Sequence, residues 1–578
     1  MSNMNNDSKK DNNPDEKSID DKKVITDIKP TTTTLKDVVI HELERIGKGG
    51  WWVWSLFFLC VTPNILNGFH VSSYVFLGHI PEEVHCSVDV LRDANWTTSQ
   101  IRNITEYKLN TKGCTIWNYD YVKLVEMGYE EAFQYIKTHE TQEVSCRSKN
   151  GTKFEYDHEM GATIVAEWDL VCEKSVHRTS AQLLVSIGKF LGASSFGVVS
   201  DKYGRKTSFS IAAICYMAGS ILTTVSPWYA LFLIGRLLLG AAASGIFYPA
   251  FALLTENISL KHRSWMSIAF SASYPTGMLL LALAAYLVDS WRYLQLSLTI
   301  PGFLLILNIF LMRESPRWLL SHNRVADAYK IVFRKKKDLE FNQIEEKPII
   351  EQKKEEKMEG QCMWTRIRGC FKEFGALFGP PRIRRMVLTC YFMWCVTSLC
   401  YYVTALNADN LAANRYMYVA ITGLVDIPSY ILPMILLKFM GRRKAATTMF
   451  AIAGISLLLV LAVPQGYEQW LVVFAMSGRF GISGVYSIVT LFTTELFPTE
   501  IRNTALGTCS TMSHVGSMIA PYVVDVLGLV GAFIPTTLCG SLVLVAGVLI
   551  LTLPETGTRK LADNVGEENE ELKDSEDA

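Results

Sequence analysis

The 578-residue sequence lacks several patterns that mark other classes of protein. Its 56 basic residues balance its 56 acidic ones, which argues against a nucleic-acid partner, since such proteins usually show a clustered basic excess. It contains no glycine-rich phosphate loop that ends in lysine, no histidine pair at metal-ligand spacing and no nucleophile motif. The sequence therefore predicts no enzyme, no ATP hydrolysis, no metal ion and no other cofactor.

The beginning of the chain lacks the apolar core of a secretory signal peptide. Residues 1–34 are polar and rich in Asn, Asp and Lys, which predicts a disordered tail. Apolar residues at helical spacing then predict a lead-in helix at 35–50. At the other end of the chain, 554–578 is interpreted as an acidic, solvated tail.

Long apolar runs are the feature that the sequence has in abundance, with 49% hydrophobic residues overall. Roughly 20 apolar residues span a bilayer core of about 30 Å, where only helices and closed barrels satisfy every backbone group. We therefore expect an all-α membrane protein with about twelve spans, six before and six after a polar loop at 313–386. The expected spans are 51–76, 179–199, 208–226, 229–254, 265–288 and 292–312, then 387–406, 416–439, 445–463, 468–492, 506–528 and 533–553.

Positive charge in the short connections predicts the orientation. Lys and Arg gather after the second, fourth, eighth and tenth spans, for example at Lys206, Lys261, Arg443 and Arg502. The connections after the third, ninth and eleventh spans carry none. Because Lys and Arg mark the cytoplasmic side of short loops, both termini are expected in the cytoplasm.

One connection, 77–178, is long enough to form a small extracellular domain. It holds four cysteines, which in an oxidising compartment permit two disulfides in three possible pairings. These are Cys86, Cys114, Cys146 and Cys172. It also holds three Asn-x-Thr sequons, which predict glycosylation at Asn95, Asn103 and Asn150. The sequons favour the secretory route and a multi-pass protein of the plasma membrane.

The two halves, with spans over 179–312 and 387–553, carry similar short motifs at corresponding positions. Asp201-Lys-Tyr-Gly-Arg205 after the second span is echoed by Met440-Gly-Arg-Arg after the eighth. Gly235-Arg236 is echoed by Gly478-Arg479, and the acidic residue near the end of the sixth span by one after the twelfth. Repeated halves are a hallmark of transporters.

Acidic and basic residues recur together in these repeats, which predicts a cytoplasmic gate. Such side chains pair when the inward face is closed and separate when it opens, and an exposed pair contributes only about 1 kcal/mol. The alternative is that the basic residues only set the orientation. The predicted gate residues are Asp201, Arg205, Arg236, Glu256, Arg263, Glu314, Arg317, Arg442, Glu495, Arg502 and Glu555.

Several of these motifs resemble those of the major facilitator superfamily: Asp201–Lys206, Arg236 with Gly240, and Glu314-Ser-Pro-Arg-Trp-Leu319. Within it, the chain resembles the organic cation, organic anion and carnitine transporter family. That narrower resemblance rests on the cysteine-containing loop and on the stretches 166–172, 495–502 and 519–521. The resemblance implies two six-helix bundles around a central cavity that opens alternately to either side.

Three ionisable residues lie in the middle of apolar spans, where burial costs several kcal/mol and marks a functional candidate: Asp426, Arg479 and His514. By the resemblance, cation transporters carry Asp at the position of His514, and anion or carnitine transporters carry Arg. Histidine departs from both patterns, since it is neutral or cationic near neutral pH. The alternatives are a neutral His514 hydrogen-bonded between helices, and an Asp426–Arg479 pair that joins two helices rather than an Asp426 that attracts a cation.

Aromatic side chains complete the predicted cavity, because ring faces attract cations by about 0.5–2 kcal/mol each. They are Phe247, Phe251, Trp394, Tyr401 and Tyr402, for which ordinary helix packing is the alternative. The sequence thus predicts a carrier of small organic ions, with cations or zwitterions such as amine- or carnitine-like molecules as substrates. Membrane lipid is an expected partner, and sodium or a proton is an open coupling ion. The alternatives are an organic anion carrier that uses Arg479 and a protonated His514, and a receptor that retains the fold without transport.

Overall fold

The computed structural model describes most of the chain. The described residues are 35–81, 84–109, 113–139, 141–148, 152–156, 162–333, 375, 377–411, 414–464, 466–498 and 501–556. The expected disordered tail at 1–34, most of the expected acidic tail and the middle of the 313–386 loop lie outside these residues.

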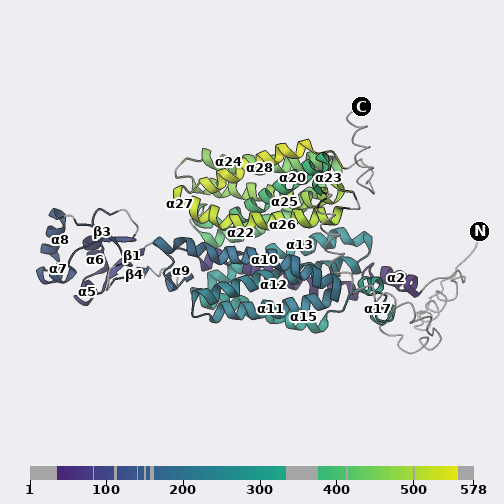
Figure 1. Cartoon of the computed structure of the whole chain (residues 1–578), viewed down its shortest axis with the longest axis horizontal. Coiled ribbons are helices and arrows are strands. Elements are labelled where there is room, and N and C mark those ends of the chain that lie inside the picture. Colours follow the sequence, from purple (N-terminus) through teal and green to yellow (C-terminus); the bar gives the residue numbers. More distant parts are fainter. Residues whose placement is uncertain are drawn as a thin grey trace, which may run out of the picture.

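Among the described residues, twelve helical stretches are long and apolar enough to cross a membrane, which confirms the predicted fold class. Figure 1 shows two bundles side by side, one blue to teal and one green to yellow. The first bundle consists of α3 (Trp51–Ser72) with α4 (Tyr74–Leu77), α10 (Ser175–Tyr203), α11 (Arg205–Val225), α12 (Tyr229–Asn257), α13 (Leu260–Leu287), and α14 (Trp291–Thr299) with α15 (Leu304–Leu311). The second consists of α20 (Pro381–Leu406), α22 (Arg415–Ser429) with α23 (Ile431–Phe439), α24 (Arg442–Leu459), α25 (Glu468–Leu496), α26 (Arg502–Tyr522) with the π-helical turn η5 (Val523–Leu527) and α27 (Gly528–Val530), and α28 (Ile534–Leu549).

The connection between α10 and α11 is shorter than the sequence suggested. The apolar pattern placed Arg205 and Lys206 in a loop, but α11 already begins at Arg205. Gly204 ends α10 with a φ of 105°, a backbone conformation that side chains other than glycine rarely adopt. One glycine therefore turns the chain, and the basic residues belong to the first turn of the next helix.

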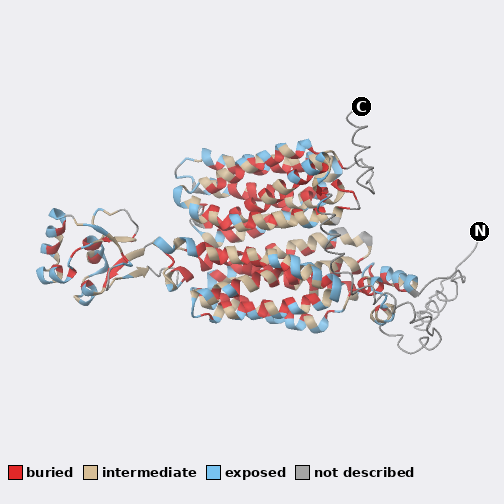
Figure 2. Cartoon of the chain, in the orientation of Figure 1, coloured by how far each residue is buried: buried red, intermediate tan, exposed pale blue. Residues whose placement is uncertain are grey.

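The buried residues lie inside each of the two bundles. In Figure 2 the buried residues face the inside of each bundle, and many residues on the outside are exposed. Large apolar side chains are among these, for example Val198 at 67%, Phe310 at 77% and Phe439 at 82% exposure. An apolar outer surface of this kind suits the bilayer core, where no water is present to bind polar groups.

The described part of the 77–178 loop folds into a small domain at one end of the bundles (Figure 1). Strand β1 (Val84–Val88) pairs antiparallel with β4 (Thr152–Tyr156), and β2 (Thr115–Trp117) pairs antiparallel with β3 (Glu143–Ser145). The helices α5 (Asp89–Asp93), α6 (Thr98–Thr105), α7 (Tyr121–Met127) and α8 (Tyr129–Thr138) pack against them over a small apolar core. Two disulfides form, Cys86–Cys146 and Cys114–Cys172, which is one of the three pairings that the sequence left open.

The bundles have two distinct ends. We call the end that carries the small domain the domain end. At the other end, the opposite end, α2 (Leu35–Ile46) packs with α16 (Pro316–Ser321) and α17 (Val325–Val332) (Figure 1). Val39 and Leu43 of α2 and Trp318 of α16 are buried in this contact.

Candidate functional site

A fully buried ion pair lies in the second bundle. Arg479 on α25 donates from Nε to Asp426 Oδ1 at 3.0 Å and from Nη2 to Oδ2 at 2.7 Å, and both side chains are 0% exposed. Ser483 donates to Oδ1 at 2.7 Å and the Tyr401 hydroxyl to Oδ2 at 3.1 Å. The Asp426 carboxylate thus has four donors, and its charge is compensated within the protein.

The guanidinium of Arg479 joins a third helix to this pair. Its Nη1 donates to the Tyr401 carbonyl on α20 at 2.8 Å, and its Cζ lies 4.0 Å from the centre of the Tyr401 ring. The structure therefore brings Asp426, Arg479 and Tyr401 together as a contact between α20, α22 and α25. Neither charge of the pair is exposed to solvent in this conformation.

Five tyrosines from both bundles gather at the level of this ion pair. Four tyrosines lie near Tyr402 on α20, namely Tyr248 on α12, Tyr274 on α13, Tyr430 between α22 and α23, and Tyr486 on α25. We call these five residues the tyrosine cluster. All of them keep some solvent exposure. The sequence analysis named only Tyr402 of this set, because tyrosines in apolar spans are also ordinary packing residues.

A lysine in the first bundle meets the tyrosine cluster. The Nζ of Lys189 on α10 donates to the Tyr402 hydroxyl at 3.0 Å and lies 5.3 Å from the centre of its ring. The contact crosses from the first bundle to the second. Lys189 was not among the predicted site residues, although the rule that selected Asp426, an ionisable residue inside an apolar span, selects it too.

His514 on α26 is partly exposed and lies close enough to Lys189 for the two to interact electrostatically. Its Nε2 has no hydrogen-bond partner among the described residues. The hydrogen bond between helices that was one alternative for His514 is therefore not formed through this atom.

The other predicted cavity aromatics pack against neighbouring helices. Phe247 and Phe251 stack with 6.3 Å between ring centres, and both lie within 5.4 Å of the Phe270 ring centre on α13. Trp394 is buried, donates from Nε1 to Thr493 Oγ1 at 3.0 Å and contacts Tyr486 edge to face. Trp394 adjoins the tyrosine cluster, whereas Phe247 and Phe251 form an aromatic contact within the first bundle.

A charge cluster at the opposite end joins three segments of the first bundle. The Glu314 carboxylate accepts the backbone N–H groups of Arg205 at 2.8 Å and Lys206 at 3.1 Å, at the start of α11. The Arg205 guanidinium pairs with Glu256 at 3.0 Å and with Asp201 at 3.0 Å. A side chain at Gly204 would collide with the Glu314 carboxylate and displace it from these N–H groups, and the φ of 105° favours glycine there as well.

The second bundle repeats this arrangement. The Glu555 carboxylate accepts the backbone N–H groups of Arg442 at 2.8 Å and Arg443 at 3.2 Å, at the start of α24. Arg442 pairs with Glu495 at 3.0 Å, and a side chain at Gly441 would collide with Glu555. The repeat seen in the sequence is thus a repeat of contacts, and each cluster pairs within its own bundle.

This symmetry leads to a prediction of matched effects. Glu314→Gln and Glu555→Gln each remove the charge that two helix N–H groups share, and each is expected to lower stability by about 1–3 kcal/mol. The measurement is the apparent melting temperature of the purified variants in detergent. Asp327→Asn, which removes an exposed pair with Arg324 on α17, is the control and should leave the melting temperature unchanged. Wild-type melting temperatures for both Glu variants would contradict the matched-cluster interpretation.

The remaining predicted gate residues are Arg236, Arg263, Arg317 and Arg502, and the ion pairs described for the two charge clusters do not include them. Arg236 is 0% exposed and donates to Ser73 Oγ at 3.0 Å and Gln182 Oε1 at 3.2 Å. It lies two turns inside the domain end of α12, so the structure does not bring it to the opposite end with the other predicted gate residues. Arg502 donates to the Phe497 carbonyl at 3.3 Å. Ion pairs between described residues do not include Arg263 or Arg317.

At the domain end, an acidic residue of the second bundle binds three groups of the first. Asp525, in the π-helical turn η5, accepts from Tyr74 at 2.5 Å, Thr179 at 2.8 Å and Arg178 Nη2 at 2.5 Å. Arg178 and Asp525 are only 9% and 7% exposed. Single π-helical turns are frequent at functional sites. The sequence analysis did not identify this contact.

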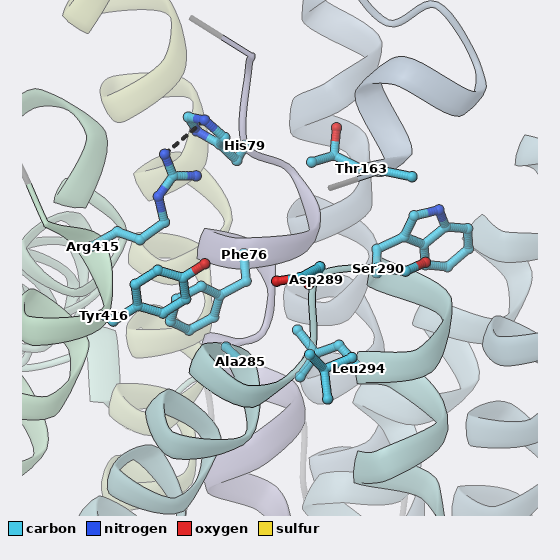
Figure 3. A pocket seen from close by; sticks show the side chains of 12 residues that line it. Phe76, His79, Thr163, Ala285, Asp289, Ser290, Leu294, Arg415 and Tyr416 are labelled. Carbon is cyan, nitrogen blue, oxygen red and sulfur yellow. Dashed lines mark hydrogen bonds between the residues drawn. The ribbon is translucent and has the colours of Figure 1, made fainter. Parts of the chain in front are cut away.

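A second set of contacts joins the bundles around a pocket at the same end (Figure 3). Arg415 donates to His79 Nε2 at 2.7 Å, and the rings of Phe76 and Tyr416 stack with 5.4 Å between their centres. Asp289 lies on the same pocket wall. The contacts described here between the bundles lie at the domain end and at the central level, so this conformation is closed at the domain end.

Two helical bundles that repeat each other's contacts around a shared polar centre define a membrane carrier. A family model described as "Sugar (and other) transporter" matches residues 115–564. The chain belongs to this family of the major facilitator superfamily and is a transporter rather than an enzyme.

Two fruit-fly (Drosophila melanogaster) relatives illustrate the match. One, named "Organic cation transporter protein", is 30% identical, with 92% of this chain and 93% of that protein covered. Another, "Organic cation transporter-like protein", is 31% identical, with 92% of each covered. Human solute carrier family 22 member 16 is 29% identical over 90% of this chain and 91% of its own length.

The solved structures agree on the fold. A partially occluded, inward-open xylose transporter XylE from E. coli superimposes with a TM-score of 0.54 and 13% identity, covering 89% of this chain and 100% of that one. The resemblance to the major facilitator superfamily and to its organic cation transporters, inferred from sequence motifs, is confirmed.

Proposed function

We propose that this chain moves small organic ions across the plasma membrane by alternating access, and that its substrates are cations or zwitterions with an ammonium group. The observation that carries the proposal is the tyrosine cluster, which both bundles supply. Ring faces attract an ammonium group by about 0.5–2 kcal/mol each. Because both bundles supply the rings, a movement of one bundle against the other changes the site. The printed names of the fruit-fly relatives support the same substrate class.

The orientation belongs to this proposal. The domain end is outside the cell and both termini are in the cytoplasm, as the placement of Lys and Arg favours. Two disulfides in the small domain agree with an oxidising compartment. Asn95 and Asn103 are exposed there and accept glycans in this proposal, whereas Asn150 lies outside the described residues. The charge clusters at the opposite end then lie on the cytoplasmic side. Because their pairs stay within one bundle in this conformation, they form a cytoplasmic gate only by exchanging partners between the bundles when that side closes.

A carrier of organic anions is the second candidate. The sequence analysis gave the anion-binding role to Arg479 and a protonated His514, but Arg479 is bound by Asp426. The observation that favours this candidate is Lys189, whose charge lies at the tyrosine cluster.

Uptake by expressing cells tests the proposal. Radiolabelled tetraethylammonium, carnitine and an aromatic carboxylate are supplied with and without sodium, and after depolarisation with potassium. Uptake of carnitine or tetraethylammonium supports the proposal, and a fall on sodium removal identifies the coupling ion. Uptake of the aromatic carboxylate alone would assign the chain to the second candidate.

A further inference from the structure

The ammonium group of Lys189 has a distinctive set of neighbours. Among the described residues, two buried cations of the membrane helices have a carboxylate partner: Asp426 binds Arg479, and Asp525 binds Arg178. Ion pairs between described residues do not include Lys189, whose observed partner is the Tyr402 hydroxyl. A charge inside the membrane is costly and marks a substrate or ion pathway.

We propose that Lys189 binds the carboxylate of the substrate, so that the carrier selects carboxylate-bearing zwitterions over simple organic cations. This inference rests on the proposed function, because it assigns the second end of a substrate whose ammonium group lies against the tyrosine cluster. An ammonium has three N–H donors, and the hydrogen bond to Tyr402 uses one of them. Two donors are left for a carboxylate, with which they form charge-assisted hydrogen bonds.

The position of Lys189 also explains how selectivity arises. A cation without a carboxylate brings a second positive charge close to Lys189 and gains no compensating bond, which is the repulsive element that specificity requires. His514, which lies close enough to Lys189 to interact with it electrostatically, adds no negative charge. Asp426 does not offset this repulsion, since Arg479 already neutralises it.

Binding at Lys189 couples to the movement of the bundles. Lys189 belongs to the first bundle and Tyr402 to the second, so their hydrogen bond joins the bundles at the central level. A carboxylate bound by the two remaining N–H donors of Lys189 adds a contact beside this hydrogen bond when the site fills. A ligand shifts a conformational equilibrium only through such differences in contact between the two states.

The test uses two probes of equal shape. Carnitine carries a carboxylate, and carnitinamide replaces it with an uncharged amide. Lys189→Met is expected to raise the KM for carnitine by about tenfold or more, as loss of a charged hydrogen-bond partner does, and to leave the KM for carnitinamide unchanged or lower. Lys189→Arg keeps the charge and retains the preference for carnitine. Lys330→Met, at an exposed lysine on α17, is the matched control and leaves both KM values at their wild-type level.

The outcomes separate the inference from the proposed function. Suppose that the wild type takes up carnitinamide as well as carnitine, and that Lys189→Met changes the KM values for both probes or for neither. Lys189 then does not bind the carboxylate, and the inference fails while the proposed function stands. If the wild type at the cell surface takes up neither of these probes nor tetraethylammonium, the proposed function fails. Thermal stabilisation of the purified protein then decides the inference, which requires that carnitine raise the melting temperature of the wild type and not of Lys189→Met.

Discussion

The Asp426→Asn variant is expected to lose nearly all transport and much of its stability. The substitution leaves the Arg479 guanidinium buried at 0% exposure without its counter-charge. Breaking one partner of a buried pair costs about 3–5 kcal/mol, because the remaining charge stays out of water. Carnitine uptake per molecule at the cell surface and the melting temperature of the purified variant measure the two effects. A wild-type melting temperature would contradict the account of this pair.

A double variant separates the two roles that the sequence left open for Asp426. Asp426→Asn combined with Arg479→Gln removes both charges, and removal of a whole buried pair is often neutral for stability. If the pair serves to hold α22 to α25, the double variant is more stable than either single variant and regains part of its transport. If the Asp426 charge attracts the substrate, the double variant folds and stays inactive. The four donors to Asp426 predict the first result.

Asp525→Asn is expected to shift the carrier towards a conformation that is open at the domain end. Asp525 accepts three hydrogen bonds from the first bundle, one of them from the Arg178 guanidinium. Loss of a charged hydrogen bond of this kind costs about 1.5–3 kcal/mol, which corresponds to a change of about tenfold or more in the population of the open state. Nitroxide labels on Tyr293→Cys and Leu529→Cys, exposed positions on the two bundles at this end, report the change as a larger long-distance population by electron paramagnetic resonance.

The control for this variant removes an ion pair at the same end that does not join the bundles. Arg292 pairs with Glu167 within the first half of the chain. Glu167→Gln is therefore expected to leave the distance distribution unchanged. Equal distributions for Asp525→Asn and the wild type would show that the contact does not hold the domain end closed.

The spans were predictable because each depends on a local property, an apolar run long enough to cross the membrane. The meeting of Asp426 with Arg479 was foreseeable for a related reason, since both lie deep in apolar spans. The assignment of Arg236 to the gate followed a repeated Gly-Arg motif rather than depth in the membrane. The structure has α12 begin at Tyr229, which leaves Arg236 near the domain end.

The contacts between the bundles could not be predicted from the sequence, for a different physical reason. Arg178 and Asp525 are 347 positions apart, and each lies near the end of a span, where charged residues are common. No periodicity connects two such residues, because their contact depends on how the bundles pack. Lys189 was recognisable as an ionisable residue in an apolar span, but its hydrogen bond to Tyr402 also crosses between bundles and follows only from packing.

The central claim is that the carrier closes alternately at its two ends. The exchange of labelled for unlabelled substrate across a membrane tests it most directly. The purified protein is placed in liposomes, and uptake of radiolabelled carnitine is compared between liposomes loaded with unlabelled carnitine and empty ones. The account predicts faster uptake into the loaded liposomes, because a substrate-filled carrier returns to the outside more readily than an empty one. Equal rates in loaded and empty liposomes, without saturation at high carnitine concentration, would contradict it.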